Sequence, residues 1–322
     1  MANLKNKMKN KTYDFLVLGA GGTGLAAAMY AARLGLKTLV LGYTSSTELP
    51  IGGVITTTHV VENYPGFTTI SGPDLAKNIE EHTRSYKLVT IKGEKATEIK
   101  KLKNCFHVKT NKSDYMTKTV LFATGTRWKK LEVPGSSEFE NKGISYCALC
   151  DGPLFRNKVV SVVGGSDSAA KDALLLTEYA KKVYIIYRSE EIHPEPINME
   201  RVKKNKKIEI INNTNVMGIN GKEFVESVLL DKKYKGSNEL KLDGVFVAIG
   251  HVVLSDLAKP LRVRLNSKGE IKINHMTSET NIPGIFAAGD VTDKPFKQLI
   301  TGVADGCTAA YSAYEYITKK KL

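Results

Sequence analysis

The spacing of apolar residues predicts alternating strands and helices from the start of the chain. Residues 13–18 form an apolar run that ends at a glycine, which indicates a buried strand. Residues 25–34 are rich in alanine and predict a helix, and residues 38–41 predict the next strand. A strand, a helix and a second strand in this order predict a βαβ unit with a parallel sheet.

The same order recurs in the middle of the chain. Residues 159–163 predict a strand, residues 168–179 a helix and residues 183–186 a second strand. A pair of glycines again separates the first strand from the helix. We therefore expect an α/β fold with two Rossmann-like, three-layer nucleotide-binding domains.

The remaining elements suggest how the two domains are connected. Further strands are predicted at residues 96–102, 105–110, 115–122, 208–211, 224–230, 245–249 and 285–287, and further helices at residues 73–86 and 302–317. Residues 125–134 and 250–260, which each run from a glycine to a proline, are the best candidates for domain boundaries. If both are boundaries, the second domain is inserted into the first. The expected domains are then residues 1–128 with 251–322, and residues 129–250.

One uncharged stretch has the length of a membrane-helix candidate. It runs over 18 residues, from Phe15 to Ala32. Four glycines interrupt it, so a strand, a turn and a buried helix explain it better. Residues 1–11 are basic and polar and lack the apolar core of a signal peptide. We expect a soluble, cytoplasmic protein that has no membrane partner.

Composition and charge narrow the class of protein. Hydrophobic residues make up 42% and charged residues 25%, which is ordinary for a globular chain, and four cysteines are too few for a disulfide-stapled secreted scaffold. The formal net charge is +14, and lysine supplies 39 of the 47 basic residues. Arginine is the preferred bidentate ligand of phosphates and bases. The charge therefore favours a solvated lysine-rich surface over nucleic-acid binding, with an acidic protein partner as the alternative.

The turn after the first strand carries a full G-x-G-x-x-G motif. Its glycines are Gly19, Gly21 and Gly24. Between a strand and a helix they permit a tight turn, close approach of a pyrophosphate and close helix packing, and the helix N-terminus favours phosphate. A glycine turn without a ligand is the alternative. The acidic residue that usually follows the second strand is missing, because Gly42 and Tyr43 stand there.

The second turn is a degraded version of this motif. It reads Gly164-Gly165-Ser166-Asp167-Ser168-Ala169. A serine replaces the glycine that lets the backbone approach pyrophosphate. A nucleotide site and a purely structural turn both remain open.

A C-x-x-C pair, Cys147 and Cys150, lies just before the second βαβ unit. This spacing indicates redox chemistry or a metal. Zinc would need two more ligands, but there is no second C-x-x-C, and His193 and His251 are isolated, so we expect a dithiol/disulfide couple and no metal. The first cysteine of such a pair is commonly the exposed one of low pKa. Inert cysteines are the alternative.

Four other residues complete the set of candidates. Asp151 follows the pair and is either an acid/base beside the thiols or a cap of the next turn. Asp290 follows the strand at residues 285–287. Cys105 and Cys307 are expected to be small core residues.

Taken together, these features resemble the low-molecular-weight thioredoxin reductases of bacterial and archaeal type. These are FAD-containing disulfide reductases of the pyridine nucleotide-disulfide oxidoreductase superfamily, with a C-x-x-C in the inserted domain. The matching stretches are residues 19–24, 52–53, 56–58, 62–66, 123–125, 145–152 (SYCALCDG), 284–292 (GIFAAGDVT) and 298–307. The resemblance covers residues 13–317.

The resemblance implies where FAD binds. Gly19, Gly21 and Gly24 would hold its pyrophosphate, Asp290 its ribityl chain, and residues 1–128 and 251–322 would form its domain. The other FAD-binding residues would be Gly53, Thr57, Asn63, Ala123, Thr124, Gly125, Gln298 and Leu299, the last two at the flavin ring.

It also implies the reaction and the partners. Two electrons would pass from a reduced donor through FAD to the Cys147–Cys150 disulfide and on to a thioredoxin-like or glutaredoxin-like protein. Cys150 would lie nearest the flavin, Cys147 would attack the partner disulfide, and Asp151 would give or take a proton. The family is homodimeric.

Three departures from the family make the electron donor an open question. Val54 stands where members often have Gln, and Ser166 breaks the second glycine motif. NADPH-dependent members carry His-Arg-Arg-x-x-x-Arg after the next strand, whereas this chain has Tyr187-Arg188-Ser189 and, four residues later, His193.

The donor site would comprise Gly164, Ser166, Ala169 and Arg188, in a domain of residues 129–250. NADPH or NADH is the expected donor, with a deazaflavin or a ferredoxin as alternatives. Rival functions are a peroxiredoxin-reducing subunit, which a missing N-terminal redox domain disfavours, a dithiol oxidase, and a flavin-bound redox sensor without turnover.

Overall fold

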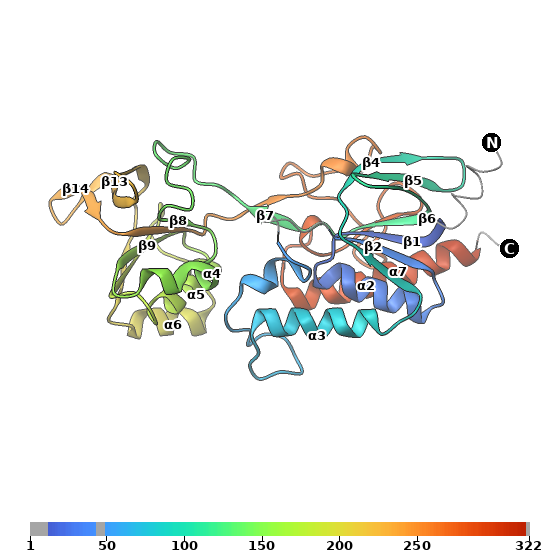
Figure 1. The fold of residues 1–322 in the computed structure, drawn as a ribbon, viewed down its shortest axis with the longest axis horizontal. Coiled ribbons are helices and arrows are strands. Elements are labelled where there is room, and N and C mark those ends of the chain that lie inside the picture. The colour runs from blue at the N-terminus through green and yellow to red at the C-terminus, as the bar shows by residue number, and fades with distance from the viewer. Residues whose placement is uncertain (1–11, 43–48, 320–322) are drawn as a thin grey trace. The chain divides into compact units, whose positions relative to one another are not determined.

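The computed structural model describes residues 12–42 and 49–319. Tyr43 and residues 1–11, which entered two of the expectations above, lie outside this range. The chain forms two compact units, unit 1 (Met1–Arg127 and Val253–Leu322) and unit 2 (Trp128–Val252) (Figure 1). Each contains a parallel-rich sheet with helices packed against it, so the predicted α/β class is confirmed. Over the described ranges, no helix combines the length and apolarity needed to cross a membrane.

Unit 1 is built on one mixed sheet. Among the described residues its strand order is β3-β2-β1-β6-β5-β4, and β17 pairs with β6. The strands are β1 (Thr12–Leu18), β2 (Thr38–Leu41), β3 (Val89–Lys92), β4 (Ala96–Lys101), β5 (Phe106–Thr110), β6 (Asp114–Phe122) and β17 (Ile285–Ala287). Strands β3, β2, β1, β6 and β17 pair in parallel, whereas β4 and β5 pair antiparallel with each other and β5 with β6.

Both faces of the parallel strands are covered, which explains the continuous apolar run of the first strand. Phe15 and Val17 pack in a cluster with α2 and α7, while Leu16 and Leu18 pack in a second cluster on the other face. The helices are α2 (Gly22–Arg33), α3 (Gly72–Arg84) and α7 (Leu299–Lys319), with short 3₁₀ turns η1 (Gly53–Thr57), η3 (Asp256–Ala258) and η4 (Gly289–Val291). Figure 1 shows these three helices on one side of β1 and β2.

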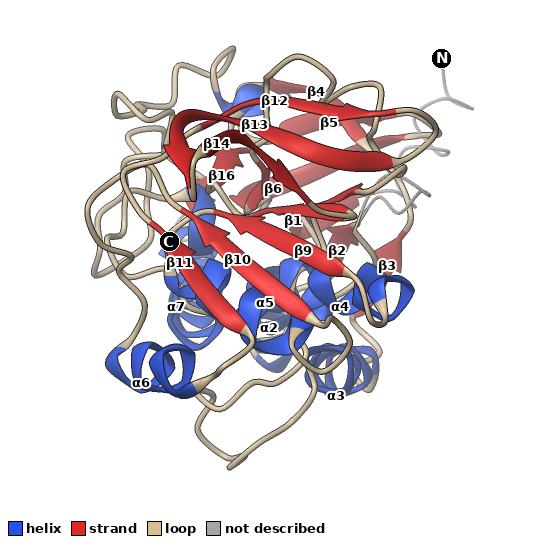
Figure 2. Cartoon of the chain, turned by 90° about the vertical axis from the view of Figure 1, so that its left-hand side faces the viewer, coloured by secondary structure: helices blue, strands red, loops and turns tan. Residues whose placement is uncertain are grey.

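Unit 2 repeats this layering on a smaller sheet. Within the part of the chain described, the parallel strand order is β11-β10-β9-β15-β8, and β12, β13 and β14 form an antiparallel sheet. The elements are β8 (Ile144–Ser145), α4 (Ala148–Asp151), η2 (Gly152–Phe155), β9 (Val159–Val163), α5 (Asp167–Leu176), β10 (Lys182–Ile186), α6 (Pro196–Lys204), β11 (Ile208–Ile211), β12 (Val216–Gly221), β13 (Val225–Tyr234), β14 (Ser237–Lys241) and β15 (Gly244–Val247). Figure 2 shows β9, β10 and β11 above α4, α5 and α6.

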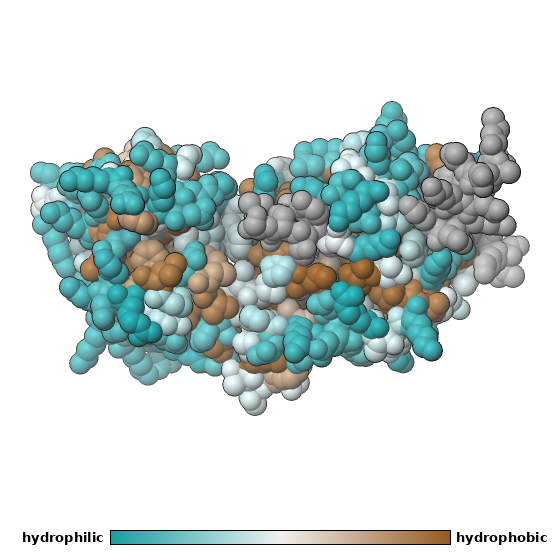
Figure 3. All heavy atoms as spheres, viewed as in Figure 1, coloured by the Kyte–Doolittle hydropathy of each residue, from teal (hydrophilic) through white to brown (hydrophobic). Residues whose placement is uncertain are grey.

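Two short strands join the units. β7 (Thr126–Trp128) and β16 (His251–Val253) pair with each other where the chain leaves unit 1 and where it returns. Hydrophilic residues cover most of the face of each unit drawn in Figure 3, as expected for a lysine-rich chain.

Several element boundaries differ from the prediction. Helices α2 and α7 begin at Gly22 and Leu299, three residues earlier than predicted, because the glycine turn and the loop before α7 pass directly into helix. Among the described strands and α-helices, eight were not predicted: strands β3, β7, β8, β12, β14 and β16 and helices α4 and α6. All these strands and α4 have six residues or fewer, and the nine residues of α6 begin with a proline, so each gives few positions from which to recognise a period.

Candidate functional site

The first glycine turn forms a cradle at the N-terminus of α2. Gly19 has φ +107°, and a Cβ there would lie 2.3 Å from the carbonyl oxygen of Ala123. A Cβ on Gly24 would lie 2.0 Å from the carbonyl oxygen of Gly19, so only glycine permits this packing. Among the described residues, a Cβ on Gly21 would meet only the carbonyl oxygen of Gly52, at 3.7 Å, which leaves room for a ligand at this backbone.

The electrostatics of this helix end suit an anion. Gly21 is the N-cap of α2 and provides no side-chain cap hydrogen bond, and the first turn of the helix contains no acidic residue. The first backbone N–H groups of a helix carry partial positive charge and lack partners within the helix. The arrangement fits a pyrophosphate, and its glycines are the predicted ones.

Strand β2 ends directly against this cradle. A Cβ on Gly42 would lie 2.3 Å from the Cβ of Ala20, so a larger residue at position 42 would displace the turn. This packing accounts for a glycine at the position where an acidic residue was expected. Tyr43 is outside the described residues.

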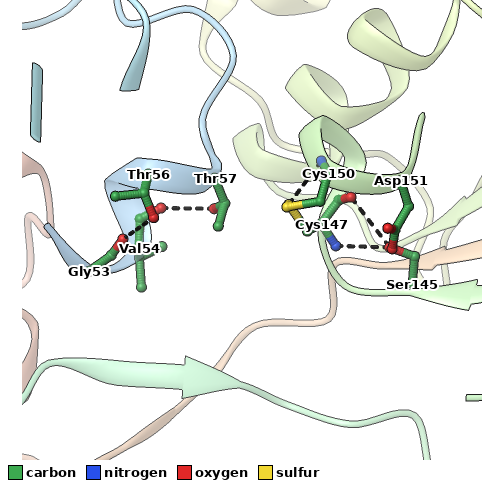
Figure 4. Close-up of a disulfide and its surroundings, with 8 residues drawn as sticks. All are labelled: Gly53, Val54, Thr56, Thr57, Ser145, Cys147, Cys150 and Asp151. Atoms are coloured by element: carbon green, nitrogen blue, oxygen red, sulfur yellow. Dashed lines mark hydrogen bonds between the residues drawn. A yellow bond between two sulfur atoms is a disulfide. The ribbon is translucent and has the colours of Figure 1, made fainter. Parts of the chain in front are cut away.

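The segment that begins at Gly52 borders the turn. The Gly52 N–H donates to the carbonyl of Ala20 at 2.8 Å, and a Cβ on Gly53 would lie 3.2 Å from the Cα of Gly21. In η1 the Thr57 hydroxyl donates to the carbonyl of Val54 at 2.8 Å (Figure 4). Thr57 therefore shares one short turn with Val54, the residue at which this chain departs from the family.

Residues far apart in the sequence meet beside this turn. The amide of Asn63 donates to the side-chain oxygen of Gln298 at 3.1 Å, across 235 positions. Leu299 begins α7, and its Cδ1 would lie 2.5 Å from a Cβ on Gly22. Unit 1 thus brings Asn63, from the first part of the chain, next to Gln298 near its end, and both were predicted to bind FAD.

Residues 123–125 extend the same region. The Ala123 N–H donates to the carbonyl of Leu18 at 2.9 Å, and the Thr124 hydroxyl donates to the carbonyl of Leu254 at 2.6 Å. Gly125 has φ +62°, and no atom of the described ranges lies within 4 Å of where its Cβ would be. This segment therefore packs tightly at its first residues and is open at the glycine.

Lys297 is a site residue that the sequence analysis missed. Its ammonium donates to the carbonyls of Asp290, at 2.9 Å, and Thr292, at 3.0 Å, and forms an ion pair with Glu270. Burial raises the pKa of Glu270, but the hydrogen bonds from Lys297 and Asn266 outweigh it and hold the pKa below its ordinary value. Lys297 thereby fixes the turn that carries Asp290. Its position next to Gln298 was the only signal in the sequence.

The C-x-x-C lies at the start of α4 in unit 2. Cys147 and Cys150 form a disulfide, and the backbone N–H of Cys150 lies 3.1 Å from the Cys147 Sγ. Ser145 accepts a hydrogen bond from the Cys147 N–H at 3.1 Å and donates one to the carboxylate of Asp151 at 2.6 Å (Figure 4). A disulfide, a hydroxyl and a carboxylate are therefore joined within seven residues.

The relative exposure of the two cysteines differs from the expectation. Cys150 is exposed and Cys147 is half-buried, whereas the first cysteine was expected to be the exposed one. Cys147 is the N-cap of α4, so its sulfur turns toward the first turn of that helix. Cys105 and Cys307 are half-buried rather than core residues, and burial raises the pKa of the Cys307 thiol.

The second glycine turn keeps the shape of the first. Gly164 has φ +148°, and a Cβ there would lie 2.3 Å from the carbonyl oxygen of Ala248. Ser166 is the N-cap of α5 and makes no side-chain cap hydrogen bond, and Ala169 is fully buried. A Cβ on Gly165 would lie 2.5 Å from the ring of Tyr187, so this ring packs directly on the turn.

The charges at this helix end differ from those of α2. The carboxylate of Asp167 accepts hydrogen bonds from the Glu195 N–H and the Asn198 amide, both at 2.8 Å, and pairs with Lys171 at 2.8 Å. Burial raises the pKa of Asp167, but these partners outweigh it and lower the pKa overall. Arg188 is exposed after β10.

Sequence comparison identifies the family. Residues 13–308 match the family described as pyridine nucleotide-disulphide oxidoreductase. This chain belongs to that family. The match confirms the predicted class, an oxidoreductase that acts on disulfides. Among the described residues, no group of three or more His, Cys, Asp or Glu side chains is placed to hold a metal ion.

Proteins similar to this chain include several named thioredoxin reductase. It is 39% identical to the thioredoxin reductase of Treponema pallidum over 95% of this chain and 97% of that protein. It is 37% identical to that of Bacillus subtilis over 96% of each. The crystal structure of the Lactococcus lactis thioredoxin reductase matches with a TM-score of 0.89 and 36% identity, over 95% of this chain and 99% of that one. The predicted family resemblance is confirmed.

Proposed function

We propose that this chain is an FAD-dependent reductase that passes two electrons to the Cys147–Cys150 disulfide and then to the disulfide of a thioredoxin-like or glutaredoxin-like protein. The observation that carries the proposal is the disulfide at the start of α4, with the carboxylate of Asp151 tethered next to it. Full-length similarity to proteins named thioredoxin reductase supports the same class of acceptor.

The residues of unit 1 fit FAD. The open backbone at Gly21 and the uncapped start of α2 suit its pyrophosphate. The other residues that would hold it are Gly19, Gly24, Gly53, Thr57, Asn63, Ala123, Thr124, Gly125, Asp290, Gln298 and Leu299. When bound, FAD would accept two electrons from the donor and supply them to a disulfide.

The thiols of unit 2 would carry the electrons onward. In the reduced pair, the Cys147 thiolate attacks the partner disulfide, so one Cys147–partner S–S bond forms and the partner's own S–S bond breaks. The released partner sulfur takes from Asp151 the proton that the Cys147 thiol gave up. Asp151 next takes the proton of the Cys150 thiol, and the Cys150 thiolate attacks the Cys147 sulfur, which closes the disulfide. The second partner sulfur leaves with that proton as the second thiol. Two electrons and two protons reach the partner in total.

The proposed electron donor is a nicotinamide dinucleotide, NADPH or NADH, taken without strong preference. The shape of the second turn, with Gly164 and Ala169 closely packed, supports a nucleotide. Arg188 is the one arginine of the family's clamp that this chain retains. A deazaflavin or a reduced ferredoxin is the alternative, because Ser166 replaces the glycine at which a pyrophosphate approaches the backbone.

The finer assignments follow from the same family. We propose a homodimer that acts in the cytoplasm and binds neither nucleic acid nor membrane. The lysine-rich surface supports an interaction with an acidic protein partner.

Two measurements test the proposed function. The purified protein should be yellow with bound FAD, and it should reduce a thioredoxin-like protein anaerobically with at least one of NADPH, NADH, a reduced deazaflavin or reduced ferredoxin. Colourless protein that cannot be reconstituted with FAD would contradict the cofactor assignment. Flavin reduction without turnover of any protein disulfide would favour a redox sensor, and turnover only with oxygen a dithiol oxidase.

A further inference from the structure

We propose that Ser145 is a positioning residue for the disulfide exchange, because its hydroxyl holds the carboxylate of Asp151 next to the Cys147–Cys150 pair. The inference rests on the function proposed above, in which Asp151 supplies the proton. The hydrogen bonds of the Ser145 hydroxyl go to the Asp151 carboxylate and to the backbone of Cys147.

Ser145 is held in place by the parallel sheet of unit 2. It is the last residue of β8, is only 5% exposed, and pairs with Phe246 of β15 in the parallel sheet. Its neighbour Ile144 is 2% exposed and belongs to the core cluster of that sheet. The sheet therefore fixes the position of the Ser145 backbone. The segment that follows it contains only the single turn of α4.

The hydrogen-bond distances around Ser145 indicate which partner its hydroxyl proton faces. A serine hydroxyl donates one hydrogen bond and can accept two. Asp151 Oδ2 lies at 2.6 Å and the carbonyl of Cys147 at 3.3 Å. The shorter distance is typical of a bond to a carboxylate, so the proton lies toward Asp151. The oxygen accepts from the Cys147 N–H at 3.1 Å, and one buried hydroxyl thus connects both groups.

Helix α4 cannot place Asp151 by itself. It spans only Ala148–Asp151, and a single helical turn gains too few backbone hydrogen bonds to be stable alone. Asp151 is half-buried and stands at its end. Without the tether its carboxylate would sample other rotamers and would be present less often where the leaving thiol needs a proton. Loss of a hydrogen bond to a charged group corresponds to about a tenfold change.

The choice of disulfide separates a positioning role from a merely structural one. An alkyl disulfide, such as glutathione disulfide, releases a weakly acidic thiol that needs a proton to leave. An aromatic disulfide such as 5,5′-dithiobis(2-nitrobenzoate) releases a more acidic thiol, which leaves readily as the anion. A displaced proton donor slows only the first reaction, whereas damage to the cysteine pair slows both.

The experiment uses the full chain, reduced with dithiothreitol and freed of reductant, with both disulfides as probes. We expect Ser145→Ala to slow exchange with glutathione disulfide about tenfold and to leave the aromatic disulfide within about twofold. Ser145→Thr, which keeps a hydroxyl, should restore most of the rate. Asp151→Asn should be slow in itself, and adding Ser145→Ala should slow it no further, because Ser145 acts through Asp151.

Ser161→Ala is the matched control. Ser161 is a fully buried serine of β9 in the same sheet, and its hydroxyl has no hydrogen-bond partner among the described residues. Its variant should react like the original chain with both probes. The proposal is overturned if Ser145→Ala reacts like the original chain, if both probes slow equally, or if the losses in Ser145→Ala and Asp151→Asn multiply. Failure of the unaltered chain to reduce thioredoxin-like proteins, with normal exchange here, would contradict only the proposed function.

Discussion

The two glycine turns share a backbone shape but differ in the groups that a ligand would meet. Gly19 and Gly164 both have positive φ, and a Cβ on either would lie 2.3 Å from a carbonyl oxygen, of Ala123 and of Ala248 respectively. The third residue of each turn differs, since Gly21 has no side chain and position 166 carries the exposed side chain of a serine. Packing between a strand and a helix maintains the shape, so the shape alone does not establish a ligand.

The charges at the two helix ends sharpen the difference. Helix α2 begins without an acidic residue, whereas α5 begins with Asp167, whose carboxylate is held by its own unit. The two ends therefore present different fields to a phosphate. We expect unit 1 to keep its dinucleotide under changes that alter unit 2, and the predictions below test that separation.

The largest effect should come from the cysteines. Cys147→Ser and Cys150→Ser should each abolish reduction of a protein disulfide, because exchange needs one attacking and one resolving thiol. Both variants should retain FAD and its reduction by the donor, since neither residue belongs to unit 1. The measurements are turnover with a thioredoxin-like protein and flavin absorbance under anaerobic conditions.

The exposed position of Cys150 makes the roles of the two thiols testable. If Cys147 attacks the partner, Cys150→Ser should trap the partner as a stable mixed disulfide and Cys147→Ser should not. Trapping by Cys147→Ser alone would reverse the assignment. Appreciable turnover by either variant would refute it.

The next effect concerns the selectivity between NADPH and NADH. Each charge-assisted hydrogen bond to a 2′-phosphate contributes roughly 1.5–3 kcal/mol, so each missing arginine costs at least about tenfold in affinity. Ser189 replaces one arginine of the family's clamp and His193 another, and imidazole carries less charge than guanidinium at neutral pH. We expect kcat/KM for NADPH and NADH to differ by less than about tenfold.

A variant sharpens this test. Ser189→Arg combined with His193→Arg should raise kcat/KM for NADPH about a hundredfold and leave that for NADH nearly unchanged. A hundredfold preference for NADPH in the unaltered chain would show that this interpretation of Ser189 and His193 is wrong. No reaction with either nucleotide would favour the deazaflavin or ferredoxin alternative.

The last residue of each motif, Gly24 in the first and Ala169 in the second, allows a matched exchange. A Cβ on Gly24 would lie 2.0 Å from the carbonyl of Gly19, so Gly24→Ala should cost about 1–3 kcal/mol of unfolding free energy and lower the FAD content. Ala169→Gly should cost about 0.5–1 kcal/mol through backbone entropy and leave FAD unchanged. Denaturant unfolding and the ratio of flavin to protein absorbance measure both. Equal loss of FAD in the two variants would contradict the assignment of FAD to the first turn alone.

Much of this organisation could be predicted from local sequence, and the rest depends on long-range contacts. The glycine turns, the C-x-x-C and Asp151 are short motifs whose chemistry is carried by neighbouring residues. The hydrogen bond between Asn63 and Gln298 joins residues that only the completed sheet brings together. Lys297 gains its role from Glu270, on a distant segment, and Ser145 from a hydroxyl geometry that spacing does not reveal.

The smallest effect is a pH dependence confined to unit 2. Glu209 of β11 accepts hydrogen bonds from Lys235, Tyr234 and Lys182, which lower its pKa from 4.5 to about 2. A lowered carboxylate pKa stabilises the folded state above pH 4.5, and that contribution is lost as the pH falls from 4.5 toward 2. Because the side chains of Glu209, Lys182 and Lys235 are 29%, 27% and 66% exposed, solvent screening limits the effect to about 1 kcal/mol.

Glu209→Gln tests this contribution to stability, and its FAD content tests whether the effect stays within unit 2. At pH 7 the variant should unfold with about 1 kcal/mol less free energy than the original chain, and the gap should narrow as the pH falls from 4.5 and close only near pH 2. Glu223→Gln, at an exposed glutamate of the same unit, should match the original chain throughout. FAD content should be unchanged in both, since the ion pairs of Glu209 lie within unit 2. A gap that stays constant between pH 4.5 and pH 2, or flavin release with Glu209→Gln, would show that the carboxylate does not act through its charge in β11.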